Sequence, residues 1–189
     1  MLNAHNLPAS HGVVLPLPSG GRLRAWTLAE APTMAALGQE RVIWRNMRDQ
    51  FPHPYQRANA EFFIGEVANK PNGDLVLAIE TADGVLAGSS GVHFKADVSR
   101  RSAEVGYWLG REFWGRGLAT ETVRALTDYA FATYDLARIY ALVFAWNPAS
   151  ARVLEKTGFT LEARLRDAVT KDGETIDGLL YARLRGPDE

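Results

Sequence analysis

The chain has 189 residues, with 21 basic and 22 acidic side chains and a formal net charge of −1 at pH 7. This length suits one domain with a substantial core, and the balanced charge argues against nucleic-acid binding through a broad basic face. Because there is no cysteine, disulfides, thiolate metal sites and cysteine nucleophiles are excluded. The sequence has neither the pattern of a secretion signal nor an apolar run that could span a bilayer, so we expect a soluble, cytoplasmic protein.

The N-terminal part predicts an arm, one strand and two helices. Residues 1–21 are rich in Pro, Gly, Asn and Ser, which favours an arm with little structure, and residues 22–189 then form a single domain. Alternating side chains predict the strand, and apolar residues at helical spacing predict the helices. Pro52 and Pro54 separate the two helices because proline removes a backbone donor. These three elements cover residues 22–27, 28–47 and 57–68.

The rest of the chain predicts a meander, a long amphipathic helix, a strand, a short helix and a closing hairpin. The meander strands cover residues 75–80, 85–94 and 103–109. The later elements cover residues 120–134, 137–145, 149–156, 159–166 and 175–184. Strands and helices in this order predict a mixed α/β architecture.

The segment Tyr107–Glu121 combines the end of a strand, a glycine-rich turn and the start of a helix. Unpaired backbone N–H groups converge at such a helix start, and the helix dipole favours an anion there. Gly115 and Gly117 let the backbone approach a phosphate, and Arg116 adds a positive charge. A Walker loop and the dinucleotide-binding fingerprint do not fit, because Arg116 and Gly117 follow Gly115 and position 120 is Thr. Taken alone, the segment is equally consistent with a helix start whose glycines serve only the turn.

A second segment, Ala141–Phe159, joins a buried strand to a short helix through Asn147 and Pro148. Asn is a favoured N-cap residue and Pro suits the first helical position, so capping alone explains both. Ser150 lies in the first turn of this helix, where small polar residues are common. Each of these residues is uninformative when it is considered by itself.

Together, the two segments resemble the GNAT superfamily of acyl-CoA N-acyltransferases. The loop WGRGLA is similar to the superfamily motif Q/R-x-x-G-x-G/A at Gly117 and Ala119, with Trp114 in place of Gln or Arg. The segment NPASARVLEKTGF, Asn147–Phe159, is similar to the superfamily's Asn…Gly-Phe segment. The resemblance covers residues 22–185 and looks like the RimJ/RimL branch, the ribosomal-protein N-terminal acetyltransferases and their relatives.

This resemblance implies an α/β, GNAT-type fold: a mixed, mostly antiparallel sheet of seven strands, with helices on both faces. The sheet would splay between residues 103–109 and 137–145, where the pantetheine arm of acetyl-CoA would lie. The pyrophosphate would bind the N–H groups of residues 115–120. The implied cofactor contacts are Tyr107, Trp108, Leu109, Trp114, Gly115, Arg116, Gly117, Leu118, Ala119, Thr120, Asn147 and Arg152. No metal is expected, because no two histidines have metal-ligand spacing.

The implied reaction is direct attack of an amine on the acetyl thioester. Glu104 is the candidate base and would act through a water. Alternatively, Glu104 is an exposed strand carboxylate beside Arg101, and bulk water is then the proton acceptor. Many relatives have a Tyr that protonates the departing thiolate, but Leu154 stands at that position. The resemblance therefore implies Ser150 as the donor, with Asn147 holding the pantetheine or a water.

The acceptor pocket is expected around residues 44–55, and its candidate residues are Trp44, Asn46, Phe51 and Tyr55. Core packing is the alternative for the three aromatic residues. The resemblance implies acetylation of a primary amine, foremost the N-terminal α-amine of a protein of the ribosomal type. Acetylation of a polyamine, amino acid or antibiotic is one alternative, and a non-catalytic acyl-CoA sensor is another. The sequence leaves open the acyl length and whether the chain forms a homodimer.

Overall fold

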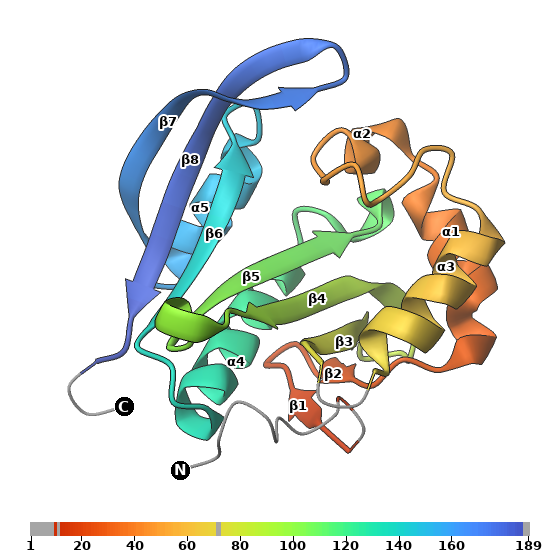
Figure 1. Ribbon diagram of the computed structural model, residues 1–189. Coiled ribbons are helices and arrows are strands. Elements are labelled where there is room, and N and C mark those ends of the chain that lie inside the picture. The colour runs from red at the N-terminus through yellow and green to blue at the C-terminus, as the bar shows by residue number, and fades with distance from the viewer. Residues whose placement is uncertain (1–9, 11, 71–72, 187–189) are drawn as a thin grey trace.

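The computed structural model describes residues 10, 12–70 and 73–186. These residues form one sheet of eight strands in the order β1-β2-β3-β4-β5-β6-β8-β7, with helices on both faces (Figure 1). Neighbouring strands are antiparallel except β5 and β6, which are parallel. The strands are β1 Val14–Pro16, β2 Arg22–Arg24, β3 Leu75–Glu80, β4 Leu86–Phe94, β5 Ser102–Leu109, β6 Arg138–Phe144, β7 Thr160–Lys171 and β8 Glu174–Leu184.

The mixed, mostly antiparallel sheet is as predicted, but it has eight strands instead of seven. Strand β1 accounts for the difference, because it pairs with β2 at the edge of the sheet. The prediction of little structure for residues 1–21 is therefore wrong at Val14–Pro16. Residues 1–9 and 11 of that segment lie outside the described part of the chain.

The helices follow the predicted order with one break. The α-helices are α1 Ala31–Gly38, α2 Arg41–Trp44, α3 Arg57–Phe62, α4 Leu118–Thr133 and α5 Pro148–Lys156. The 3-10 turns are η1 Leu28–Glu30, η3 Asp97–Ser99 and η4 Arg111–Phe113, and the π-helix η2 Phe63–Ala68 continues α3. The single helix predicted for residues 28–47 is interrupted after Gly38. A Cβ atom on Gly38 would lie only 3.0 Å from the Phe51 ring and 3.1 Å from the Tyr55 ring, so the glycine admits these aromatic residues against the helix end. In the described ranges, no helix is both long and apolar enough to cross a membrane.

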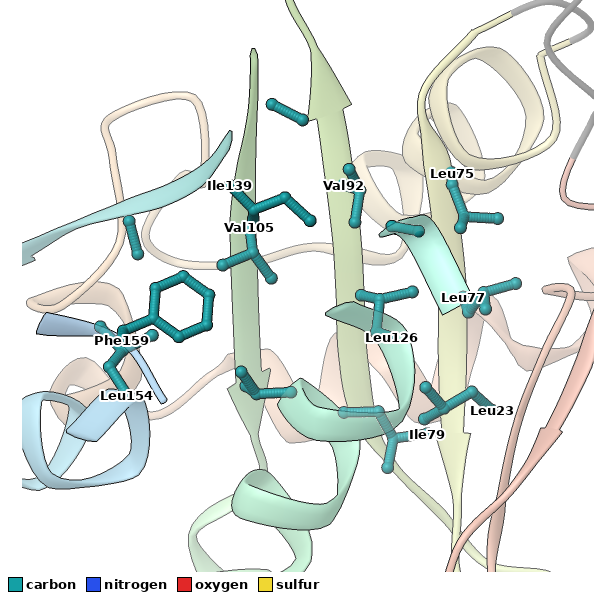
Figure 2. Close-up of a cluster of buried hydrophobic side chains, with 14 of the residues drawn as sticks. Leu23, Leu75, Leu77, Ile79, Val92, Val105, Leu126, Ile139, Leu154 and Phe159 are labelled. Carbon is teal, nitrogen blue, oxygen red and sulfur yellow. The ribbon is translucent and has the colours of Figure 1, made fainter. Parts of the chain in front are cut away.

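Two hydrophobic clusters cover the two faces of the sheet. One lies under α4 and α5, where Leu126, Leu154 and Phe159 pack against side chains of the strands (Figure 2). The other lies under α1 and α3 and includes Trp108. Strand β5 supplies both clusters by alternation, since Val105 belongs to the first and Trp108 to the second. Glu104, as predicted, shares the face of Trp108.

The sheet opens between β5 and β6. Their register contains only the pairs Ser102–Arg138, Ala103–Ile139 and Glu104–Tyr140. Beyond Glu104 the two strands diverge (Figure 1), while β6 stays paired with β8 as far as Phe144. The predicted splay is thus confirmed, and it leaves one edge of β5 from residue 105 to residue 109 without a neighbouring strand.

Candidate active site

The loop between β5 and α4 has the geometry of an anion-binding turn. Gly115 and Gly117 adopt φ angles of 75° and 83°, which side chains disfavour, and Gly117 is the N-cap of α4. A Cβ atom added to either glycine would meet nothing within 4 Å. Phe113 anchors the loop in the core, and the indole N–H of Trp114 donates to the Leu109 carbonyl at 2.9 Å. The turn is therefore fixed at both sides while its outer surface is open.

Several backbone donors of this loop are free to bind a ligand. In the described part of the chain, the N–H groups of residues 115–119 have no hydrogen-bond acceptor. Thr120 differs, because its N–H donates to the Gly117 carbonyl at 2.9 Å. Arg116 places its guanidinium 5.9 Å from the centre of the Phe113 ring, beside the turn. These free donors at the start of a 16-residue helix fit the pyrophosphate of a coenzyme A.

Strand β5 and helix α5 meet across the splay through Tyr107 and Ser150. The phenol oxygen of Tyr107 lies 2.8 Å from Ser150 Oγ and 3.2 Å from the Ser150 carbonyl oxygen. Burial raises the pKa of Tyr107 to about 12, and the hydrogen bond with Ser150 only partly opposes this. The phenol is consequently protonated at neutral pH and is able to donate to Ser150.

Helix α5 begins as the sequence predicts. The side-chain oxygen of Asn147 accepts from the Ser150 N–H at 3.2 Å, and Pro148 occupies the first turn. Leu154, at the position where the resemblance expects a Tyr, is fully buried in the core and offers no proton donor. Arg152 is exposed on the same helix. The predicted residues Asn147, Ser150 and Tyr107 are therefore brought together, but Asn147 also serves as a cap.

The predicted base, Glu104, is buried and lies between two cations. Its carboxylate pairs with Arg48, from the loop after α2, and with Lys95 at 3.3 Å. Burial opposes the charge of Lys95, but hydrogen bonds to Tyr140 and Glu104 outweigh it and raise the pKa of Lys95. The alternative of an exposed carboxylate beside Arg101 is contradicted, because Glu104 is only 9% exposed.

The predicted acceptor residues separate into two groups. Phe51 and Tyr55 are buried in the core and stack with ring centres 4.3 Å apart, and burial raises the pKa of Tyr55 to about 12. Phe51 and Tyr55 therefore pack in the core, which was the alternative to their predicted role in the acceptor pocket. Trp44, by contrast, ends α2 near the β7–β8 hairpin, where Lys171 places its ammonium 3.9 Å from the centre of the Trp44 ring. Asn46 lies in the loop after α2, and its side-chain amide donates to the Val42 carbonyl at 2.8 Å.

Two sets of partners escaped the sequence analysis. One is the pair of cations on Glu104. The other is a set of ion pairs that joins the β7–β8 hairpin to α2 and the loop after it. These pairs are Arg41–Asp172 at 2.6 Å, Arg45–Glu174 at 3.0 Å and Asp49–Lys171 at 2.7 Å. Their members are far apart in the sequence, so no local spacing indicates them.

Comparison with known proteins identifies the family. Residues 22–160 match the model of the acetyltransferase (GNAT) domain. The chain belongs to this family. The matched range includes the loop of residues 115–119, where the sequence resemblance places the superfamily motif. No group of three or more His, Asp or Glu side chains placed to hold a metal occurs in the described residues.

The similar proteins include acetyltransferases of several kinds. YdaF of Bacillus subtilis (strain 168) is 36% identical over 103 residues, 54% of this chain and 56% of YdaF. The ribosomal-protein-serine acetyltransferase of Escherichia coli (strain K12) is 32% identical over 84 residues, 44% of this chain and 47% of that protein. The chain thus spans about half the length of the curated relatives it matches.

Solved structures resemble the whole fold. RimL, a ribosomal L7/L12 α-N-protein acetyltransferase solved with coenzyme A, has a TM-score of 0.81 and 20% identity, over 91% of this chain and 98% of RimL. RimJ of Mycobacterium smegmatis has a TM-score of 0.75 and 25% identity, over 91% of this chain and 86% of RimJ. The eight-stranded splayed sheet is therefore a GNAT fold of the RimJ/RimL type.

Proposed function

We propose that the chain is an acetyl-CoA-dependent N-acetyltransferase that acetylates the N-terminal α-amine of a protein. The observation that carries this proposal is the set of free N–H groups at residues 115–119, which follows directly on the unpaired edge of β5. The pyrophosphate of acetyl-CoA would bind these donors, and the pantetheine amides would pair with the backbone of Tyr107–Leu109.

In the proposed reaction, the lone pair of the amine attacks the thioester carbonyl carbon. The C–N bond forms, the C–S bond breaks, and the electron pair of that bond leaves on the sulfur as a thiolate. Ser150 donates a hydrogen bond to the sulfur, and Asn147 fixes the helix start that carries Ser150. Because a thiol of this kind has a pKa of about 8.5, the thiolate leaves without needing a full proton transfer.

The amine must be neutral when it attacks, so its ammonium form has to lose a proton first. At pH 7, deprotonation costs about 1.4 kcal/mol for an α-amine and about 4.6 kcal/mol for a lysine amine. A modest base therefore suffices for a protein N-terminus. We assign this role to Glu104 acting through a bridging water, because the carboxylate lies on β5 beside the point where the sheet opens.

Similarity to a named relative supports a protein N-terminus as the acceptor. The Escherichia coli protein that is 32% identical over 84 residues is named a ribosomal-protein-serine acetyltransferase. Trp44 and Asn46 would contact the acceptor, since Trp44 lies beside the β7–β8 hairpin and Asn46 follows two residues later.

The test is an acetylation screen. The purified protein is mixed with acetyl-CoA and with peptides that begin with Ser, Ala or Met, with spermidine, or with free amino acids, and release of the CoA thiol is followed. We expect release with a peptide that has a free N-terminus and none with the same peptide blocked at that end. Release with small amines alone would contradict the proposed acceptor. Binding of acetyl-CoA without release would identify a sensor.

A further inference from the structure

A histidine outside the predicted site lies on the same face of the sheet as Glu104 and is hydrogen-bonded to a carboxylate. His93, on β4, places its Nδ1 atom 2.6 Å from a carboxylate oxygen of Asp74, the residue before β3. The other oxygen of Asp74 accepts from the Phe94 N–H at 3.0 Å. The carboxylate is thus fixed by two donors, and it fixes the imidazole in turn.

The opposite side of the imidazole lies over two glycines. Gly91 and Gly106 face each other across β4 and β5. A Cβ atom on Gly91 would lie 3.5 Å from His93 Nε2, and one on Gly106 would lie 3.7 Å from it. The missing side chains therefore provide the space in which the ring lies, and they bring Nε2 above β5, the strand that borders the splay.

The contact with Asp74 determines which ring nitrogen is free. A carboxylate accepts hydrogen bonds, so Nδ1 is the donor to Asp74, and Nε2 is the nitrogen at which the neutral ring accepts a proton. Burial alone would raise the pKa of Asp74, but hydrogen bonds from His93 and Phe94 hold this pKa below its usual range, so the carboxylate stays charged. Nε2 has no hydrogen-bond partner in the described residues, and the side chain of His93 is 41% exposed.

The surroundings of His93 are those of the proposed acceptor side. Its register partner on β5 is Glu104, and both side chains lie on the face opposite to α4. The charged groups that face the imidazole are Asp74 before β3, Lys95 two residues further along β4, and Glu104 on β5, which also pairs with Arg48. One oxygen of Glu104 pairs with Arg48 and the other with Lys95, whereas Nε2 of His93 is free.

We infer that His93 accepts a proton directly from the attacking amine, with Asp74 as its positioning residue. This inference rests on the proposed function and places both residues on one route: Glu104, through its water, neutralises the arriving ammonium, and His93 takes the proton that the nitrogen loses as it attacks. As the amine nitrogen bonds to the carbonyl carbon, its N–H proton passes to Nε2 and the C–S bond breaks to give the thiolate. The imidazolium then returns its proton to water. A neutral imidazole is the stronger base of the two side-chain types, since the usual pKa values are about 6.5 for His and about 4.3 for Glu.

The experiment compares the wild type with His93→Ala, in the presence and absence of free imidazole. With a Ser-initiated peptide as acceptor, we expect His93→Ala to lower kcat ~10²-fold at pH 7, the usual size of a general-base contribution. Imidazole in solution should restore part of the rate, because the substitution empties the space above Gly91 and Gly106. The deficit should shrink as the pH rises, because hydroxide then accepts the proton of the attacking nitrogen in place of Nε2.

Two further variants separate positioning from folding. Asp74→Asn should lower kcat by ~10-fold, because the ring is retained but its orientation is lost, a change worth about one net hydrogen bond. Asp135→Asn is the matched control: it removes a carboxylate from an exposed ion pair with Arg101, at 3.0 Å, and should leave kcat unchanged. Acetyl-CoA affinity, measured by calorimetry, reports folding of every variant, and His93→Gln replaces His93→Ala if the latter does not fold.

The failure of this inference is distinct from the failure of the proposed function. If the wild type releases no CoA with any acceptor of the screen, both are contradicted. If the wild type is active and the His93 variant keeps its kcat, only the role of His93 is contradicted. A loss of rate that imidazole does not restore and that is the same at every pH would likewise overturn it, because it would show a structural role.

Discussion

Strand β5 pairs with its two neighbours over very different lengths. Strand β4 pairs with it continuously, from Gly88–Leu109 to Phe94–Ala103. Strand β6 pairs only at its beginning, from Ser102–Arg138 to Glu104–Tyr140. Backbone donors and acceptors that lack a strand partner must find water or a ligand. The continuous pairing with β4, the closed seam, therefore stabilises the fold. The interrupted pairing with β6, the open seam, leaves backbone groups of β5 available to a ligand.

The open seam is nevertheless held in place. Tyr107 and Ser150 connect β5 to α5 across it, and Leu154 and Phe159 pack beneath it in the core (Figure 2). Side-chain contacts thus replace the missing strand pairs without using the β5 backbone. Substitutions in the two seams should consequently have different effects: changes at the closed seam alter stability, and changes at the open seam alter binding and turnover.

The largest effect is expected at Glu104, where the open seam begins. Glu104→Gln should lower kcat ~10²-fold at pH 7 with little change in the KM for acetyl-CoA, because a general base is lost. The deficit should shrink at high pH, where the amine deprotonates unaided. Glu162→Gln is the control, since Glu162 pairs with Arg138 at 2.5 Å on the outer strand β7. A wild-type kcat for Glu104→Gln would remove the carboxylate from the mechanism.

At the end of the open edge, Gly117→Val should weaken acetyl-CoA binding by ~2 kcal/mol or more, the value of one or two charge-assisted hydrogen bonds. The new side chain would occupy the open space in which the pyrophosphate approaches the backbone. Gly173→Val is a matched control, because Gly173 also has a positive φ, 79°, and open surroundings, but lies in the β7–β8 turn. Calorimetry that finds equal affinity in both variants would exclude the loop from the site.

The closed seam is tested by Gly88→Ala. A Cβ atom there would lie 2.1 Å from the Trp108 carbonyl oxygen, so β4 and β5 would have to separate. We expect the free energy of unfolding to fall by about 2 kcal/mol, within the range for overpacked cores. Gly65→Ala, where a Cβ atom meets nothing within 4 Å, should be neutral or slightly stabilising. Denaturant unfolding measures both, and an unchanged stability for Gly88→Ala would contradict the tight pairing.

The smallest effect concerns the contact across the splay. Ser150→Ala should lower kcat ~10-fold, on the order of one net hydrogen bond, and Ser150→Cys should keep part of the rate because a thiol is a weak donor. Tyr107→Phe should have a similar cost in the wild type and little in the Ser150→Ala background, since the two hydroxyls act together. Additive losses would show that they act separately. If Ser150→Ala turns over normally while Asn147→Ala does not, Asn147 carries the role.

Features that depend on local sequence were predictable. The glycine loop of residues 115–119 and the Asn147 cap were found because a strand end, a turn and a helix start lie within a few residues of one another. The break after Gly38 was missed because it depends on Phe51 and Tyr55, which pack against the helix end from a later loop. The same two aromatic residues show that sequence alone does not separate a pocket wall from a core side chain.

Features that depend on pairing between distant segments were not predictable. Arg48 is 56 residues from Glu104 in the sequence, and Asp74 is 19 residues from His93. The register of β3, β4 and β5 brings Asp74, His93 and Glu104 together, and the loop after α2 brings Arg48 onto Glu104. Strand β1 was missed for a similar reason, because three residues of weak alternation become a strand only beside β2.

The most direct test of the account is mass spectrometry of a Ser-initiated peptide with one internal lysine, after incubation with the protein and acetyl-CoA. The account predicts a mass gain of a single acetyl group, which fragmentation locates on the N-terminal residue. Gly117→Val should reduce this product in parallel with its loss of acetyl-CoA affinity. Acetylation of the internal lysine alone would contradict the proposed acceptor. No acetylation of this peptide or of any amine in the screen, by a protein that binds acetyl-CoA, would contradict the central claim.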